Sequence, residues 1–268
     1  MDFLDRIRYD FEASLAIAKR YMRIYYARPG TIMFGLMFPF FMFLSFAVGR
    51  KIPISMLISS LTAMTLLFSS SSIGPMILPM ERRLKTIERL LVAPISFYSI
   101  LLGIIFCSMV YSITISTIPI IIGLVLIKME IMNIIFLTVG ILCSAICFAA
   151  LGMMFASYPT EYPGNVTMAL NFVRLPLLFI SGVFVPLEVL PEWQRTIAIL
   201  SPLTYCNDII RYSLQGKTFF NPIIDAIALL LFATIFLICG VKIHVTFSDS
   251  KPRKPMKRGR MHRNQPMA

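Results

Sequence analysis

Residues 131–157 read IMNIIFLTVGILCSAICFAALGMMFAS, an apolar run without a single Lys, Arg, Asp or Glu. The hydrocarbon core of a bilayer is about 30 Å thick, and a helix needs about 20 predominantly apolar residues to cross it. Because the run exceeds that length, it predicts a transmembrane helix.

Five further apolar runs surround this one, and together they predict an all-α polytopic membrane protein with six transmembrane helices. Hydrophobic residues make up 57% of the sequence, which leaves little for a soluble domain. Arg174 interrupts the fifth run, and Asp225, near the start of the sixth, is interpreted as an interfacial residue. The predicted spans are residues 31–48, 52–80, 96–127, 131–157, 164–187 and 222–241.

Basic residues collect on one side of these spans. Six precede the first span, four lie between the second and third, eight follow the sixth, and Arg174 is counted with them; the other three loops hold six in total. Cytoplasmic loops carry the Lys/Arg excess, so we predict a multi-pass protein of the cytoplasmic membrane with both termini cytoplasmic. The same rule accounts for most of the net charge of +12, so we expect no nucleic-acid partner.

The two ends of the chain differ from the membrane domain, predicted at residues 1–247. Residues 1–28 predict an amphipathic helix at the cytoplasmic interface; the alternative is a surface helix packed on the protein. The tail, residues 248–268, is basic and predicted to be disordered, with membrane lipid as a possible contact. The apolar face of the first helix comprises Leu4, Ile7, Phe11, Leu15, Ala18, Met22 and Tyr25.

Polar side chains inside two spans are candidates for a substrate route. Span two contains Ser69, Ser70, Ser71 and Ser72; such residues either allow helices to pack closely or form the wall of a polar conduit. In span five, Asn171 lies one turn before Arg174. An intramembrane charge predicts a functional site, and the alternative is a side chain that extends to the membrane surface.

The segment between spans two and three predicts a docking helix. It carries both signs of charge and an apolar stripe of Leu84, Ile87 and Leu91, and Pro94 ends it before span three. A charged amphipathic helix between two spans suits binding to a soluble partner. The alternative is a solvated loop that carries positive charge.

The segment between spans five and six predicts two short helices on the outer side. Pro186 opens this segment, and Pro191 and Pro202 occupy positions typical of a first helical turn. Trp193 and Tyr205 suit the depth of the membrane interface.

No catalytic, cofactor or metal site is predicted in this chain. Gly216-Lys217-Thr218 ends like a phosphate-binding loop, but Arg211 stands where that pattern requires Gly. The spans contain no Asp/His cluster of the kind a membrane hydrolase or proton relay needs. Any energy source must therefore come from a partner.

Two stretches of the sequence resemble the permease subunit of ATP-binding-cassette type-2 transporters. The first, residues 81–96, reads ERRLKTIERLLVAPIS, with a Thr86-x-Glu88 core and Lys85 where the family usually has Gly. The second begins at residues 179–186, FISGVFVP, and Ser201 stands where the family commonly has Asn. It continues through Leu190-Pro191-x-Trp193 and Pro202-Leu203-Thr204-Tyr205 to Asp208 and Arg211.

This resemblance implies a half-transporter that dimerises, as a homodimer or with a paralogous permease, and binds two copies of an ATPase subunit. The ATPase would hold ATP and Mg. The family's dimer interface at spans two and five would put Ser69–Ser72, Asn171 and Arg174 near the route of an exported substrate. Short outer loops favour a hydrophobic or lipid-linked cargo. The coupling helix in the ATPase cleft would include Glu81, Arg82, Lys85, Thr86, Glu88 and Arg89.

Two other functions stay open at this point. A membrane scaffold for an ATPase would keep the docking helix but would need no polar interior. A membrane-embedded lipid-modifying enzyme would need convergent His, Asp or Cys groups at a membrane face, and the sequence places none there.

Overall fold

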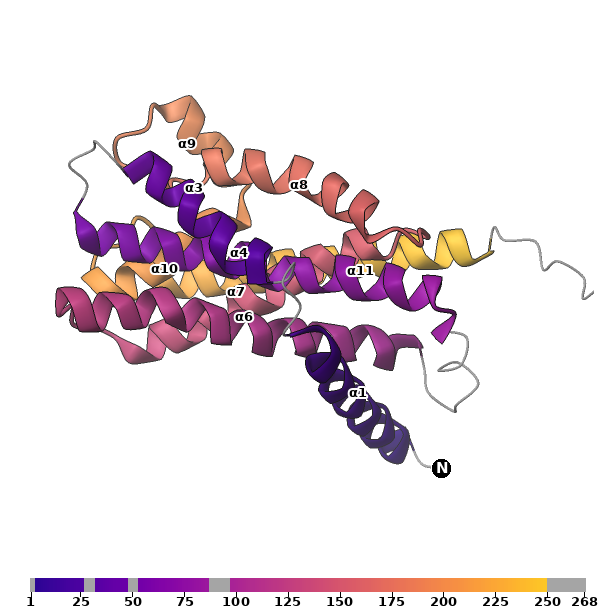
Figure 1. The fold of residues 1–268 in the computed structure, drawn as a ribbon. Coiled ribbons are helices and arrows are strands. Elements are labelled where there is room, and N and C mark those ends of the chain that lie inside the picture. Colours follow the sequence, from indigo (N-terminus) through magenta and orange to yellow (C-terminus); the bar gives the residue numbers. More distant parts are fainter. Residues whose placement is uncertain (1–2, 27–31, 48–52, 87–96, 250–268) are drawn as a thin grey trace, which may run out of the picture.

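The computed structural model describes residues 3–26, 32–47, 53–86 and 97–249, and every regular element within these ranges is helical (Figure 1). This confirms the all-α prediction. The elements are α1 (Phe3–Tyr25), the π-helical η1 (Met33–Met37), α3 (Phe38–Ala47), α4 (Ile54–Arg83), α6 (Phe97–Ile127), α7 (Ile134–Ala156), α8 (Pro163–Ile180), α9 (Glu192–Ala198), α10 (Pro202–Gln215) and α11 (Pro222–Asp249).

Within the described residues, five helices are long and apolar enough to cross a membrane. They lie in α4, α6, α7, α8 and α11, and match predicted spans two to six. The first predicted span, residues 31–48, corresponds to η1 followed by the short α3, while residues 31 and 48 lie outside the described part. The count of six spans therefore stays a prediction.

The ends of two helices and the exposure of one acidic side chain differ from what the sequence predicted. Helix α8 ends at Ile180, well before residue 187, because Gly182 has φ of +76°, a left-handed conformation that stops helices. Helix α11 continues past residue 241 to Asp249. Asp225, in the first turn of α11, is fully buried in the protein, whereas an interfacial residue was expected to face the membrane surface; its depth in the membrane stays a prediction.

Helix α4 is the centre of the bundle and packs against α6, α7, α8 and α10. It approaches α7 so closely that a Cβ atom added to Gly152 would lie 2.3 Å from the carbonyl oxygen of Ser71. On α4, a Cβ added to Gly74 would lie 3.3 Å from the backbone nitrogen of Met153. Small residues permit such contacts between helices in membranes.

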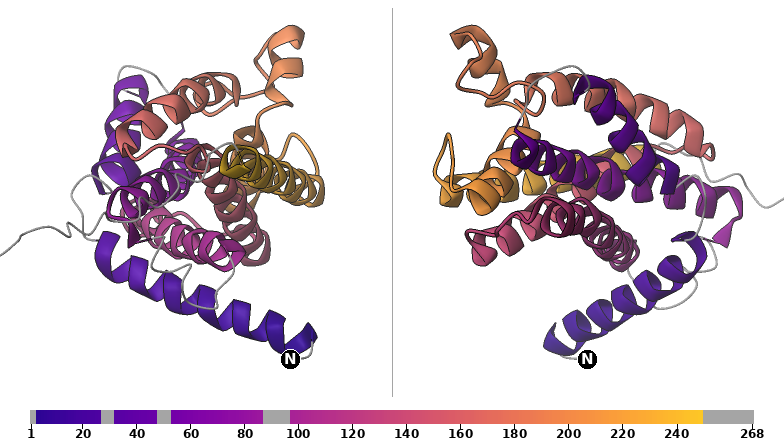
Figure 2. Two further views of the ribbon diagram at one scale, coloured as in Figure 1. Left: turned by 90° about the vertical axis from the view of Figure 1, so that its right-hand side faces the viewer. Right: turned by 60° about the vertical axis from the view of Figure 1, so that its left-hand side comes forward.

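Helix α1 lies across the bundle beneath α6 (Figure 2). One face, which includes Ile17 and Tyr21, is buried, and Ile17 meets α6 at Gly103. A helix is thus present where one was predicted, and it packs on the protein while Phe11 and Leu15 of the predicted apolar face remain exposed. Its amphipathic, interfacial role stays a prediction.

The two short helices predicted between spans five and six are α9 and α10. Pro191 precedes α9 and Pro202 is the first residue of α10, where a missing N–H has little effect. Residues 201–210 are buried against α4, α7 and α11. Figure 1 places α9 at the end of the bundle opposite the C-terminal ends of α4 and α11.

Candidate functional site

Glu81 lies in the last turn of α4 and connects three parts of the chain. Its carboxylate is 2% exposed and accepts hydrogen bonds from Arg20 Nη2 of α1 at 3.3 Å to each oxygen. Thr86 Oγ1 donates to Glu81 Oε2 at 2.5 Å. Burial and the nearby Glu81 carboxylate raise the pKa of Tyr21. Glu81 therefore fixes the end of α4 to α1 and to the turn that follows.

Arg82 makes a second connection, to the end of α7. Its guanidinium donates to the carbonyl oxygens of Ala156 at 3.0 Å, Ser157 at 3.3 Å and Tyr158 at 2.5 Å. The last carbonyls of a helix have no partner within the helix, and a cation is well suited to bind them. The end of α4 and the loop from α7 to α8 are thus held together.

The remaining described residues of the docking segment face outward. Arg83, Leu84 and Lys85 are exposed. Residues 81–83 form the last turn of α4, a turn follows at residues 84–85, and Thr86 is again helical. The rest of the short helix predicted here lies outside the described residues, so that helix stays a prediction. Glu88 and Arg89 lie outside the described residues.

The left-handed backbone of Lys85 leads to a prediction. Its φ is +55°, a conformation that favours glycine. Lys85→Gly is expected to raise the free energy of unfolding by up to about 1 kcal/mol, because a non-glycine residue is strained there. Thermal unfolding of the purified protein in detergent measures the change. Arg83→Gly, in the last helical turn, is the control and should lower stability by about 1 kcal/mol; a loss with both variants would contradict the prediction.

The four candidate serines lie on α4 within the protein. Ser69, Ser70 and Ser71 are fully buried, and Ser72 is partly buried. Ser70 Oγ donates to the carbonyl of Ala145 on α7 at 2.7 Å, while the other three donate to carbonyls of α4. In this protomer the run packs α4 against α7; its role in a substrate route stays a prediction.

Arg174 is fully buried on α8. Its Nη1 donates to Asn171 Oδ1 at 3.4 Å, and its guanidinium lies over the ring of Phe68, 5.3 Å from the centroid. Among the described residues, Nε and Nη2 find no hydrogen-bond partner. The side chain therefore does not extend to the protein surface, and the structure does bring Asn171 and Arg174 together.

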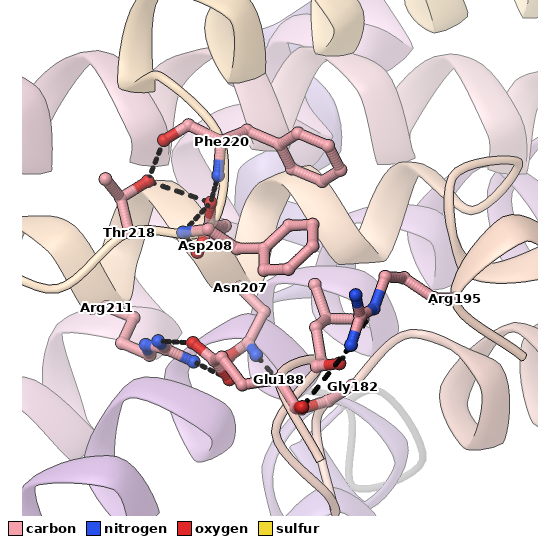
Figure 3. Close-up of polar contacts among 10 residues, drawn as sticks. Gly182, Glu188, Arg195, Asn207, Asp208, Arg211, Thr218 and Phe220 are labelled. Atoms are coloured by element: carbon pink, nitrogen blue, oxygen red, sulfur yellow. Dashed lines mark hydrogen bonds and ion pairs between the residues drawn. The ribbon is translucent and has the colours of Figure 1, made fainter. Parts of the chain in front are cut away.

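At the opposite end of the bundle, ionic contacts hold the chain between α8 and α10 (Figure 3). Arg211 of α10 forms a bidentate ion pair with Glu188, and these hydrogen bonds lower the pKa of Glu188. Arg195 of α9 donates to the carbonyls of Leu187, Glu188 and Leu190, each at 3.3 Å. Both arginines thus fix the segment that leaves α8.

Asp208 of α10 holds the turn before α11. Its carboxylate, 2% exposed, accepts hydrogen bonds from Thr218 Oγ1 at 2.9 Å and from the backbone nitrogens of Phe219 at 2.9 Å and Phe220 at 2.8 Å (Figure 3). The neighbouring Asn207 donates to the carbonyl of Gly182 at 3.4 Å. Helix α10 therefore fixes the end of α8 and the start of α11 together.

The predicted outer-helix residues contribute mainly turns and one buried hydrogen bond. The carbonyl of Pro186 accepts from the backbone N–H of Val189 at 3.1 Å. Trp193 is 64% exposed, whereas Tyr205 is buried and donates to the carbonyl of Ile199 at 2.9 Å. Only Trp193 thus has the exposure that an interfacial aromatic residue needs.

Sequence reasoning missed the partners of the docking segment. Arg20 is one of several basic residues on α1, and nothing in its sequence position indicates that it meets Glu81. The carbonyls of residues 156–158 carry no side-chain signal at all. Gly152 could have been noted as a small residue in an apolar span, but its contact with Ser71 depends on how α4 and α7 cross.

A comparison with known protein families shows which family this chain belongs to. Residues 12–214 match the model of the family described as ABC-2 type transporter. This chain belongs to the ABC-2 type transporter family. As an ABC-2 permease it is a multi-pass helical membrane protein and a component of membrane transport, which confirms the resemblance seen in the sequence.

Curated relatives of this permease match only part of it. The inner membrane transport permease YadH of Escherichia coli (strain K12) is 24% identical over 132 residues, which are 49% of this chain and 51% of YadH. The YadH protein of Shigella flexneri matches over the same shares at the same identity. The chain spans about half the length of the curated relatives it matches.

Proposed function

We propose that this ABC-2 permease is a half-transporter that dimerises and exports a hydrophobic or lipid-linked substrate, driven by a separate ATPase subunit. ATP and Mg are bound by that subunit. The permease lies in the cytoplasmic membrane; its relative YadH is named an inner membrane transport permease. Six spans put both termini on one side of the membrane, and the Lys/Arg excess makes that side the cytoplasm. The C-terminal ends of α4 and α11 lie at the same end of the bundle, which supports this orientation (Figure 1).

The observation that carries the proposal is the pair of connections at the end of α4. Glu81 connects this end to α1 through Arg20, and Arg82 connects it to the loop from α7 to α8. The exposed residues Arg83 and Lys85 and the segment after them would contact the ATPase. A movement of that segment, when ATP closes the ATPase pair, then displaces α1, α4, α7 and α8 together.

Dimerisation has a candidate surface on α8. Met168, Phe172 and Phe179 are exposed on it, with Phe172 at 74%. A second protomer on this face would put two copies of α8, with Asn171 and Arg174, beside the substrate route. Ser69–Ser72 on α4 lie one layer further in.

A native pull-down tests the proposal. The tagged chain is extracted in mild detergent, and we expect a stoichiometric soluble ATPase to co-purify. The double variant Glu88→Ala, Arg89→Ala should lose it. The control Glu192→Ala, Lys217→Ala removes two exposed charges at the other end of the bundle and should retain it.

The outcomes separate the proposed function from its alternatives. If a folded, dimeric permease brings down no ATPase, the exporter proposal is rejected. If the ATPase binds but no candidate substrate stimulates its hydrolysis in vesicles, the scaffold function is favoured instead.

A further inference from the structure

A cavity of about 510 Å³ lies where α7, α8 and α11 meet, at the end of the bundle that also carries the C-terminus of α4. Phe155 of α7, Val166 and Ala169 of α8, and Ile243 of α11 line it, together with Met154. All five side chains are apolar. The volume falls in the range of small-molecule sites, roughly 300–1,000 Å³.

The polar residues that line the cavity come mainly from the loop between α7 and α8. Tyr158 and Thr160 belong to this loop, and Asn165 to the first turn of α8. By length and composition, the candidate membrane spans in α7, α8 and α11 end or begin at Ala156, Pro163 and Thr246. The cavity therefore lies near the ends of these spans, where the hydrocarbon core would meet the headgroups and where amphipathic aromatic residues such as Tyr gather.

The occupant of an apolar cavity in a bilayer is chosen among water, empty space and the surrounding lipid. Water needs two to four polar partners to be stable in a cavity, and the five apolar side chains of the lining offer none. If the cavity stayed empty, the side chains that line it would lack dispersion contacts on that side. Acyl chains are the most abundant apolar molecules next to a membrane protein, and they reach this depth from the side.

We propose that the cavity binds one acyl chain of a membrane phospholipid. Lys242, which directly precedes Ile243, is exposed and provides a cation for the headgroup phosphate. Thr160 and Asn165 provide polar groups beside it. This inference does not depend on the ATPase or on the exported substrate.

The bound chain also supports the loop that Arg82 holds. Phe155 and Tyr158 line the cavity. Arg82 donates to the carbonyls of residues 156–158, which directly follow Phe155 and include Tyr158. A chain in the cavity packs against one side of this loop while Arg82 holds the other. Where the proposed function holds, lipid occupancy then stiffens the anchor of the docking segment.

Photolabelling in vesicles tests the site. The full chain is reconstituted in phosphatidylcholine with a small, increasing fraction of phosphatidylglycerol that carries a diazirine on its acyl chain, and labelled peptides are mapped by mass spectrometry. We expect label at residues 154–169 and at Ile243 that saturates with probe. Label at Leu231 of α11, which is 59% exposed and does not line the cavity, reports non-specific lipid contact and should rise in proportion to the probe.

Two variants sharpen the test. Ala169→Trp on α8 fills the cavity and should abolish the saturable label while leaving the label at Leu231. Val245→Trp places the same side chain on α11, two residues after Ile243, at a position that is 47% exposed and does not line the cavity, and should retain both labels. Cavity label that never saturates, or that survives Ala169→Trp, overturns the proposal.

A photoreactive residue identifies the occupant directly. A diazirine-bearing aliphatic residue in place of Ala169 should form a lipid adduct on illumination. A cross-link to a peptide of residues 250–268 would make the tail the occupant, and a cross-link to a second chain would make it a dimer contact; either result overturns the proposal without requiring any large side chain in the cavity.

Discussion

Gly152→Val is expected to abolish the folded bundle, and Gly152→Ala to lower the free energy of unfolding by about 3 kcal/mol or more. An added Cβ atom at Gly152 would lie 2.3 Å from the carbonyl oxygen and 2.8 Å from both the carbonyl carbon and the Cα of Ser71. These are backbone atoms of α4, so no side-chain rotation relieves the overlap. The two helices must separate, and the buried contacts between them open.

Thermal unfolding of the detergent-solubilised protein measures this effect, with expression in the membrane as a second readout for the valine variant. Gly164→Ala is the matched control. It lies in the first turn of α8, where an added Cβ has no atom within 4 Å, so its stability should stay within about 0.5 kcal/mol of the parent. Equal effects of the two alanine variants would show that helix propensity, rather than the α4–α7 contact, governs stability.

The positions of most candidate membrane helices could be predicted from the sequence, because the length of an apolar run is a local property. Residues 131–157 contain α7, and the predicted spans two, three and six likewise fall on α4, α6 and α11. The end of α8 was harder to predict. Ser181 to Leu187 are as apolar as a span, and only the left-handed Gly182 ends the helix.

The candidate site could be predicted only in part because its contacts join distant segments. Glu81 was grouped with the charges of the docking segment, yet it is buried against Arg20, 61 residues away in the sequence. The serine run had two possible roles, and the choice depends on the position of Ala145. Such pairings follow from helix packing, which the spacing of residues along one chain does not encode.

Asp208→Ala is expected to lower the free energy of unfolding by about 2–4 kcal/mol, because it leaves backbone donors without their acceptor. The carboxylate accepts from Thr218 Oγ1 and from the backbone nitrogens of Phe219 and Phe220. Alanine leaves the two backbone nitrogens without this acceptor, and each buried unsatisfied group costs about 1–3 kcal/mol. Thr218 Oγ1 can still donate to the carbonyl of Phe220. The turn that leads into α11 then loses its position relative to α10.

Asp225→Asn is the matched control, because it removes a buried carboxylate that lacks such a network. Asp225 is fully buried, and among the described residues neither of its oxygens has a hydrogen-bond partner. Removing a charge without partners should leave stability unchanged or raise it. Both variants are compared by thermal unfolding in detergent at neutral pH. If Asp225→Asn destabilised the protein as much as Asp208→Ala, burial of the acids rather than the three hydrogen bonds of Asp208 would explain both losses. A loss of stability with Asp208→Ala alone would assign the position of α11 to Asp208, because of the two carboxylates only Asp208 accepts hydrogen bonds from the turn before α11.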